Sequence, residues 1–242
     1  MKGIWIIAKR ELASYFDSLI AYMIIIIFLG ISGFFTWIIG NTVFLRNQAD
    51  LSNFFEIFYI SLFLFIPAIT MRSLAEEKRS GTIELLSTKA VSDWEIIIGK
   101  FLSGYILVLI ALASTLPYYF TIAYLGSIDH GAVWGGYFGL MLISAAYVSI
   151  GIFASSLTNN QIIALLIAMM VGIFFHFLFD ILASGFTGPI ATILNYLSVS
   201  THFESLSRGV IDSRDLIYFF SLIFVGLYLS QTMLSKRNWQ DA

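Results

Sequence analysis

Six long apolar runs constrain this chain more than any other feature of its sequence. A helix crosses the hydrocarbon core of a bilayer with about 20 consecutive apolar residues. Six segments meet that requirement: Leu19–Ile39, Phe54–Met71, Phe101–Leu125, Val133–Leu157, Ile162–Ala183 and Leu216–Leu234. Backbone polar groups cannot stay unpaired in hydrocarbon, so runs of this length are expected to be helical. The sequence therefore predicts an all-α polytopic membrane protein with six transmembrane helices, organised as one domain over residues 1–242.

Composition supports this class and excludes several functions. Charged residues make up 12% of the chain and its mean hydropathy is +0.88, whereas soluble domains carry about 25% charged residues. A net charge of −2 without a basic tract argues against binding to nucleic acid. The absence of cysteine excludes disulfides and thiolate metal sites. We therefore expect no metal and no cofactor in this chain. The first apolar run lacks a cleavage pattern of small residues, so we interpret it as a retained span.

The positions of lysine and arginine predict how the chain crosses the membrane, because cytoplasmic loops carry an excess of both. If the N-terminus is cytoplasmic, ten of the 13 basic residues lie inside and three outside. The inner set is Lys2, Lys9, Arg10, Arg72, Lys78, Arg79, Lys89, Lys100, Lys236 and Arg237, and the outer set is Arg46, Arg208 and Arg214. We therefore expect both termini and residues 72–100 to be cytoplasmic.

Two further segments show helical patterns outside the six spans. Residues 1–17 have an apolar stripe at every fourth position, formed by Ile4, Ala8, Leu12 and Phe16. This pattern predicts a helix that lies in the inner interface with its apolar face toward the membrane. A plain cytoplasmic extension of the first span is the alternative.

The second such segment, residues 184–215, follows the fifth span on the outer side. Its middle part, Pro189–Leu197, is apolar but too short to cross a bilayer. We expect a re-entrant or interfacial helix there, held by the rest of the bundle. Ser198 and the polar residues after it resemble a helix cap, and Phe203, Leu206 and Val210 continue at helical spacing.

The connection over residues 72–100 is the only long, charge-dense segment of the sequence. Gly81 interrupts it before a short amphipathic stretch, which Thr82 can cap as a helix. That stretch contains three apolar residues, Ile83, Leu85 and Leu86, around the acidic Glu84. Apolar side chains exposed in a cytoplasmic loop indicate a surface that a partner covers. We therefore favour a docking helix over a passive, solvated connection.

Common enzyme motifs are absent, and one intramembrane polar pair stands out. The sequence contains no phosphate-binding loop, no H-E-x-x-H and no G-x-S-x-G. His176 and Asp180 are four residues apart in the fifth run, so they share one face of a helix. Such a pair can hydrogen-bond, relay a proton or contact a substrate. A structural or interfacial pair remains the alternative.

Several stretches resemble the permeases of type-2 ABC transporters, and among these the permease subunit associated with gliding motility. The resemblance covers the whole chain, and its most specific part is Glu76–Leu86. Other matching stretches are Pro67–Arg72, Asp93–Glu95, Gly99–Lys100, Lys9–Leu12 with Tyr15–Phe16, Ser200, His202–Phe203 and Arg208–Asp215.

The resemblance implies a fold, a set of partners and a site. The fold has six helices, an interfacial N-terminal helix and short exofacial helices before the last span. Residues 72–100 would carry a coupling helix that docks on a separate cytoplasmic ATPase dimer, which binds ATP and Mg²⁺. The coupling residues would be Glu77, Arg79, Gly81, Thr82, Ile83, Glu84, Leu85 and Leu86.

The resemblance also implies a second membrane partner and a location. The chain would act in the bacterial inner membrane beside a second copy or a homologous subunit with an outer domain. Its work would be export, or envelope and gliding-related movement. Three alternatives stay open: ATP-driven force transmission without transport, a membrane enzyme built on His176 and Asp180, and a passive channel. No run shows the polar residues at helical spacing that a channel needs.

Overall fold

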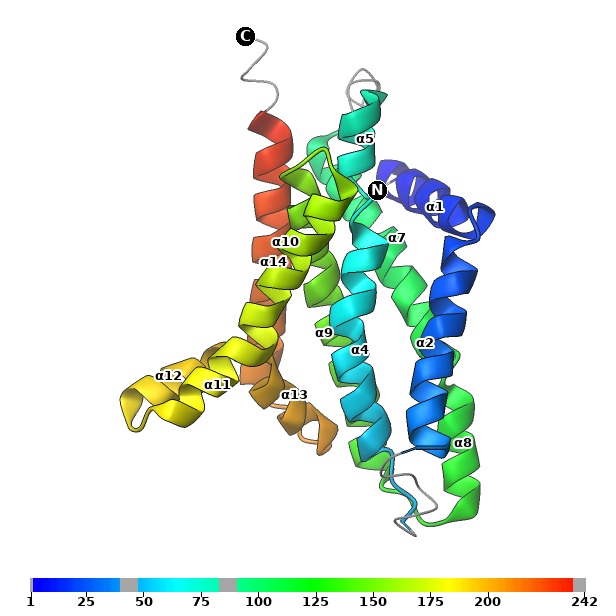
Figure 1. The fold of residues 1–242 in the computed structure, drawn as a ribbon, viewed down its shortest axis with the longest axis vertical. Helices are drawn as coiled ribbons and strands as arrows, with labels where there is room; N and C mark the ends of the chain where they lie inside the picture. Colours follow the sequence, from blue (N-terminus) through cyan, green and yellow to red (C-terminus); the bar gives the residue numbers. More distant parts are fainter. Residues whose placement is uncertain (1, 40–47, 83–90, 237–242) are drawn as a thin grey trace.

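The structure is a bundle of long apolar helices, as the sequence predicts (Figure 1). It is a computed structural model that describes residues 2–39, 48–82 and 91–236, and all structural statements concern these residues. Six helices are long and apolar enough to cross a membrane: Ile20–Trp37, Ser52–Ser80, Asp93–Leu125, His130–Ser156, Gln161–Gly185 and Ser213–Ser235. The described ranges contain no strand. The all-α class and the six spans are therefore confirmed.

Three of these helices are unbroken and three are divided. The unbroken ones are α2 (Ile20–Trp37), α9 (His130–Ser156) and α14 (Ser213–Ser235). The divided ones are α4 (Ser52–Thr70) with α5 (Ala75–Ser80), α7 (Asp93–Ala113) with α8 (Leu116–Leu125), and α10 (Gln161–Ile173) with the π-helix η1 (Phe174–Leu178) and α11 (Phe179–Gly185). Pro117 at the start of α8 has no N–H to donate to the preceding turn, so it favours the break there.

Helix α9 forms the centre of the bundle. In its most apolar stretch 83% of the residues are buried, against 22% in α2 and 17% in α14. Small residues let the neighbouring backbones approach α9 closely, as is usual between membrane helices. At Gly151, an added Cβ would lie 2.0 Å from the Thr70 Oγ1 of α4. The contact between α4 and α9 therefore depends on the missing side chain.

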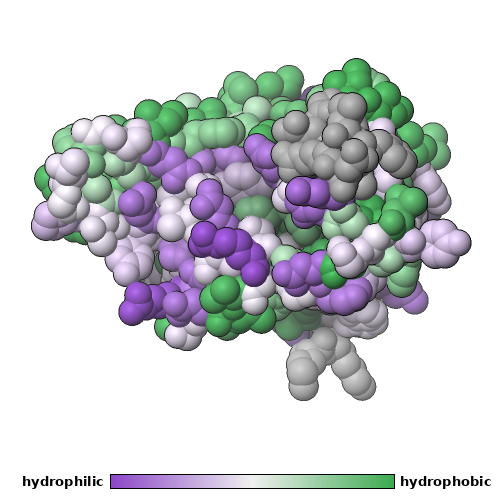
Figure 2. Space-filling model, turned by 90° about the horizontal axis from the view of Figure 1, so that it is seen from below, coloured by the Kyte–Doolittle hydropathy of each residue, from purple (hydrophilic) through white to green (hydrophobic). Residues whose placement is uncertain are grey.

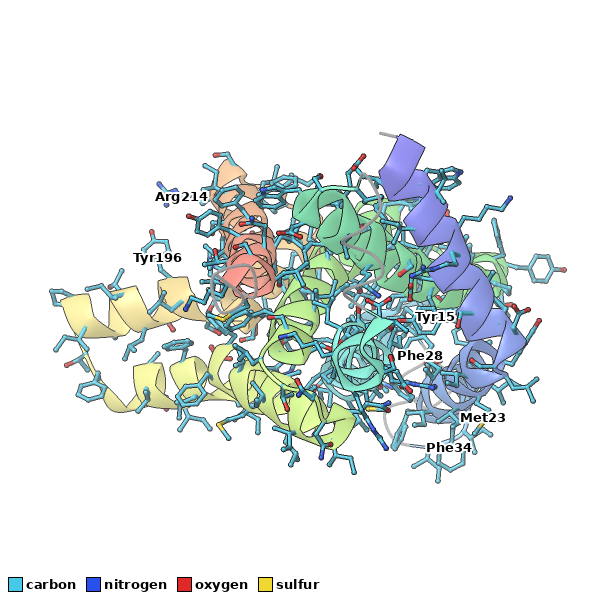
Figure 3. The ribbon with its side chains drawn as sticks, turned by 90° about the horizontal axis from the view of Figure 1, so that it is seen from above. Tyr15, Met23, Phe28, Phe34, Tyr196 and Arg214 are labelled. Carbon is cyan, nitrogen blue, oxygen red and sulfur yellow. The ribbon has the colours of Figure 1, made fainter. Side chains whose placement is uncertain are left out.

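Helix α2 shows how the outer helices divide their faces. Phe28 is only 2% exposed and points into the bundle, where its ring packs edge-on against Phe58 of α4. Met23 and Phe34 on the same helix point away from the bundle (Figure 3) and are exposed. An apolar surface of this kind is suited to lipid.

Helix α1 (Lys2–Asp17) lies across one end of the bundle, beside α5 (Figure 1). We call this end, with α1, α5 and the start of α7, the charged end. The structure confirms the helix, which packs mainly on α7. Of its predicted apolar stripe, Ala8 is buried and Leu12 and Phe16 pack against the core of the bundle. At Gly99 of α7, an added Cβ would lie 2.8 Å from Ile7. Trp5 and Ile6, outside the predicted stripe, are exposed instead and can face a membrane.

At the end of the bundle opposite the charged end, α11 and α12 form a hairpin that extends sideways, and the short helix α13 follows it (Figure 1). Helix α12 (Pro189–Leu197) has the predicted bounds. It packs against α11 and has no buried residue (Figure 1). Only its C-terminal end is bonded to the bundle, where the Tyr218 hydroxyl of α14 donates to the Leu197 carbonyl at 2.6 Å. At its end, Arg214 Nη1 donates to the Tyr196 hydroxyl at 3.4 Å (Figure 3).

Helix α13 (Val199–Ser207) follows, with Ser198 as its predicted cap. The Ser198 hydroxyl accepts from the backbone N–H of Ser200 at 3.2 Å. Phe203 and Leu206 are buried as expected, because they face α9. Val210 is 58% exposed, since the helix ends before it at the positive-φ Gly209. Its predicted place in the apolar row was therefore wrong.

Candidate functional site

Helix α5 leads directly into residues 81–88, which carry the predicted docking helix and which we call the docking segment. Helix α5 is bonded to its neighbours on several sides. Its first turn lacks a side-chain cap of its own. Ser155 of α9 supplies one, because its hydroxyl oxygen accepts from the N–H groups of Leu74 and Ala75 at 2.9 Å each. The same hydroxyl donates to the Met71 carbonyl at 3.0 Å. The start of α5 is thereby fixed to the end of α9.

Two further bonds join α5 to the turn between α9 and α10. The Lys78 ammonium donates to the carbonyl of Ser156. The Gln161 amide, in the first turn of α10, donates to the Glu76 carboxylate. Arg72 pairs with the same carboxylate at 3.4 Å. A displacement of α5 must therefore move these two helices or break the bonds to them.

An ionic cluster with a buried lysine at its centre joins α5 to α1 and α7. At its centre is Lys100 of α7, whose side chain is 1% exposed. The Lys100 ammonium lies 2.9 Å from Glu77 Oε1 and 3.4 Å from Glu11 Oε1, and it donates to the Ser73 carbonyl at 2.7 Å. Arg10 of α1 completes the cluster, with Nη2 2.6 Å from Glu11 and 3.3 Å from Glu77. We call these four residues, Arg10, Glu11, Glu77 and Lys100, the ionic cluster.

The charges of the cluster compensate each other, but its hydrogen bonding is incomplete. Two cations face two carboxylates, as a buried ionic group requires. The hydrogen bond to Glu11 raises the pKa of Arg10. Glu77 uses Oε1 for both cations, whereas its Oε2 is buried without a hydrogen-bond partner. The cluster therefore has one acceptor atom that no donor among the described residues reaches.

Tyr15 strengthens the attachment of α1 beside the cluster. Its hydroxyl donates to the Ile69 carbonyl of α4 at 3.2 Å. Burial raises the pKa of Tyr15, so the phenol stays protonated and keeps donating. Helix α1 is therefore bonded to α4 as well as to α5 and α7.

Most predicted coupling residues lie at or beyond the tip of α5. Arg79, Gly81 and Thr82 are exposed, and Gly81 adopts a φ of +69°, which suits the predicted glycine break. The Thr82 hydroxyl lies 2.9 Å from that of Ser80. Ile83, Glu84, Leu85 and Leu86 fall outside the described residues. Glu77 differs from the rest, because it belongs to the ionic cluster inside the protein.

The chain is also fixed where it enters α7. Ser92 and Glu95 form a capping box, in which the Ser92 hydroxyl accepts from the Glu95 N–H at 3.3 Å. The chain is thus structured before the docking segment, at the glycine turn after α5, and after it, at this cap.

Sequence reasoning missed the ionic cluster, although the position of Lys100 carried a signal. Lys100 was counted as a loop charge before a span that begins at Phe101. The apolar residues Ile96 and Ile97 extend the helix upstream, which places Lys100 two turns inside it. A lysine so deep in an apolar helix requires a partner. The identity of that partner depends on the fold, because Glu11 and Glu77 are distant in sequence.

The structure places the two members of the intramembrane pair with different partners. His176 lies in η1 and is 2% exposed. Its Nδ1 is 2.7 Å from the Tyr147 hydroxyl of α9, and its ring stacks on Tyr59 of α4 at 3.9 Å. Asp180, in α11, accepts from the Ser200 hydroxyl of α13. The pair thus connects the fifth span to three other helices.

A second histidine, which sequence reasoning noted only as part of a cap, is also buried. His202 Nδ1 lies 2.6 Å from Asp215 Oδ1, and Nε2 lies 3.1 Å from the Tyr196 carbonyl. Each ring nitrogen thus lies within hydrogen-bond distance of an oxygen atom. This pair connects α13 to the start of α14 and is suited to holding these two helices together.

None of these groups forms a recognisable catalytic arrangement within the described ranges. No cluster of three or more histidine and carboxylate side chains that could hold a metal occurs there. The ionic cluster contains no nucleophile, and its cations are already bonded to carboxylates. What the charged end offers is a mechanical connection between α5 and the rest of the bundle.

Comparisons with known proteins agree with a transport role for such a bundle. Residues 7–230 match the model of a family described as "ABC-2 family transporter protein". The chain is also similar to the "Probable multidrug ABC transporter permease YbhR" of Escherichia coli strain K12 and of Escherichia coli O157:H7. Each is 24% identical over 154 residues, which cover 60% of this chain and 39% of the relative. The match thus spans well under half the length of these relatives. Because the family match covers nearly all of the bundle, this chain belongs to the ABC-2 family of transporter proteins.

Proposed function

We propose that this chain couples ATP hydrolysis on a separate cytoplasmic ATPase dimer to movement of a transmembrane bundle that exports a substrate. ATP and Mg²⁺ bind to that dimer, and this chain serves as the non-catalytic membrane subunit. The observation that carries the proposal is the bonding of α5. This helix leads into the predicted docking segment and contacts α1, α7, α9 and α10 through the bonds described above.

Closure of the ATPase dimer on ATP would push or pull the docking segment. Because both ends of that segment are fixed, the motion passes to α5 and to the start of α7. The bonds of α5 distribute it to the bundle as a rigid-body step. The spare Oε2 of Glu77 supplies a second acceptor, so the cluster can exchange donors while its charges stay paired.

The transport path would run between this chain and a second membrane subunit, either another copy or a homologue with an outer domain. Export is the first candidate for the work done. Movement of an envelope partner, including gliding, is the second. The feature that favours the second is the α11–α12 hairpin, which extends sideways from the bundle (Figure 1) and offers a surface to a neighbouring protein.

The proposal requires the charged end to be cytoplasmic. We expect a cysteine at Ser80, next to the glycine turn, to be protected from impermeant maleimide in sealed cells. Cysteines at Asn47 and Ser205 are expected to react from outside. The native chain has no cysteine, so each label reports one position. Permeabilised cells provide the control, in which Ser80 also reacts. Outside labelling of Ser80 in sealed cells would contradict the topology.

The docking segment itself provides the test of ATPase coupling. We expect Leu85→Asp and Glu84→Lys to reduce the amount of ATPase that co-purifies with the tagged chain about tenfold or more. The first places a charge in an apolar contact, and the second reverses a charge in the same patch. Recovery of a phosphate-loop protein and ATP hydrolysis per mole of chain are measured together.

The control for these variants is Ser87→Ala, a small change in the same segment, which is expected to leave both readouts unchanged. The chain purified without its ATPase is expected to hydrolyse no ATP, because it lacks a phosphate loop. Full recovery of the ATPase and full hydrolysis with both charged variants would show that residues 81–88 are an ordinary solvated connection.

A further inference from the structure

A large cavity lies at the end of the bundle opposite the ionic cluster. Its volume is about 1110 Å³, and its walls come from α4, α9, η1, α13 and the connections before α4 and α9. Figure 2 shows this end of the molecule, where hydrophilic side chains gather toward the middle of the face and apolar ones toward the rim. Cavities of several hundred Å³ or more are of a size that holds small organic ligands.

Acidic residues outnumber basic ones in the lining of the cavity. The lining includes four acidic residues, Asp50, Glu56, Asp129 and Glu204, and one basic residue, Arg208. Two of the carboxylates are occupied, because Asp50 accepts from the Ser52 N–H and Asp129 from the Gly131 N–H, both at 2.9 Å. The carboxylates of Glu56 and Glu204 are exposed and make no hydrogen bond or ion pair with the residues that the structure describes.

Several aromatic rings also line the cavity. The ring of Tyr59 lies between two others, stacked on Phe203 at 5.0 Å and on His176 at 3.9 Å. Phe55 and Phe177 also line the cavity. The faces of phenyl and phenol rings carry negative potential and attract cations, and organic cations with planar bodies also stack on them. The aromatic wall and the two free carboxylates therefore favour the same class of ligand.

Two polar atoms of residues that line the cavity have no hydrogen-bond partner in the part of the chain that the structure describes. The Tyr59 hydroxyl and His176 Nε2 are buried without a hydrogen bond, and their residues are 8% and 2% exposed. The other ring nitrogen of His176 is occupied by Tyr147. Unpaired buried polar groups are costly and uncommon in folded proteins. The π-helix η1 holds His176 in this position, and such helices are frequent at functional sites.

We propose that this cavity binds an organic cation with a flat apolar body and a hydrogen-bonding group. The positive charge would lie near Glu56 and Glu204, and the body would pack against the rings of Phe55 and Phe203. Its polar group would reach the Tyr59 hydroxyl and His176 Nε2. The site does not depend on the docking segment, so it can be tested on the chain without an ATPase.

Ethidium, a planar aromatic cation, is a suitable probe for the full chain purified in lipid nanodiscs. We expect saturable binding, measured by fluorescence, that tetraphenylphosphonium displaces. The double variant Glu56→Gln/Glu204→Gln is expected to weaken ethidium binding about tenfold, because two charge-assisted contacts are lost. Tyr59→Phe, which removes only the hydroxyl, is expected to weaken it about threefold.

Two comparisons separate this site from nonspecific adsorption. Asp17→Asn removes a carboxylate at the charged end and is expected to leave the affinity unchanged. Arg208→Gln removes the competing cation of the cavity and is expected to tighten binding. Size-exclusion profiles and thermal unfolding show that each variant is folded. The proposal is overturned if neither cation binds saturably or if the double carboxylate variant binds ethidium as the native chain does. Equal displacement of ethidium by the anion anilinonaphthalene sulfonate also overturns it.

Discussion

Replacement of Lys100 by methionine is expected to lower the free energy of unfolding by about 3 kcal/mol and to abolish ATP-driven activity. Lys100 is the most deeply buried member of the ionic cluster, with a side chain that is 1% exposed. Its removal leaves Glu11 and Glu77 to share Arg10, whose side chain is 51% exposed. The loss of one partner leaves an uncompensated buried charge, which is more costly than removal of the whole pair. Unfolding in detergent and hydrolysis in the assembled complex are the two measurements.

Two comparison variants make this result specific to the cluster. Lys9→Met removes a lysine from the exposed side of α1 and is expected to change stability by less than about 0.5 kcal/mol. The double variant Glu77→Gln/Lys100→Met is expected to recover much of the lost stability, because it removes both charges. It is not expected to recover coupling, since α5 and α7 remain without their ion pair. If Lys100→Met were as stable and active as Lys9→Met, the cluster would have no part in either property.

Replacement of Gly151 by valine is expected to cost about 3 kcal/mol or to prevent folding. A Cβ at this position would lie 2.0 Å from Thr70 Oγ1 and 2.8 Å from Thr70 Cβ. Neither helix can move away easily, because α9 is central and α4 packs along it. The midpoint of thermal unfolding and the yield of monodisperse protein report the effect.

The matched control is Gly30→Val in α2, where an added Cβ meets nothing within 4 Å. It is expected to have little effect. Gly151→Ala combined with Thr70→Ala is expected to be more stable than Gly151→Ala alone, because the nearest clashing atom is removed. A native unfolding midpoint for Gly151→Val would mean that α4 and α9 are not in close contact.

The sequence was sufficient for features that depend on local pattern or on membrane thickness. The six spans follow from the length of the apolar runs. Helix α12 follows from Pro189 and the apolar residues after it, and the turn at Gly81 from the tolerance of glycine for positive φ. Each of these features is decided by residues that are neighbours along the chain.

Features that depend on distant contacts were out of reach. The stripe on α1 could indicate a lipid surface or a helix surface, because both are apolar, and the structure packs Ala8, Leu12 and Phe16 of this stripe at the core of the bundle. Val210 fitted a helical row, but Gly209 ends that helix first. Tyr147 had no visible link to His176, which lies 29 positions later. The ionic cluster joins residues from three separate segments, and pattern along the chain cannot show which charges meet.

The cap that Ser155 provides for α5 has a consequence for biogenesis. Helix α5 has only six residues, too few to persist as an isolated helix in water. The hydroxyl that completes its first turn comes from a residue that the ribosome adds 80 positions after Ala75. Helix α5 is therefore expected to take shape only after α9 has entered the bilayer. In a nascent or truncated chain without α9, the helix that leads into the docking segment would be unformed. The ATPase would then be recruited only to subunits whose fourth span, α9, is in place.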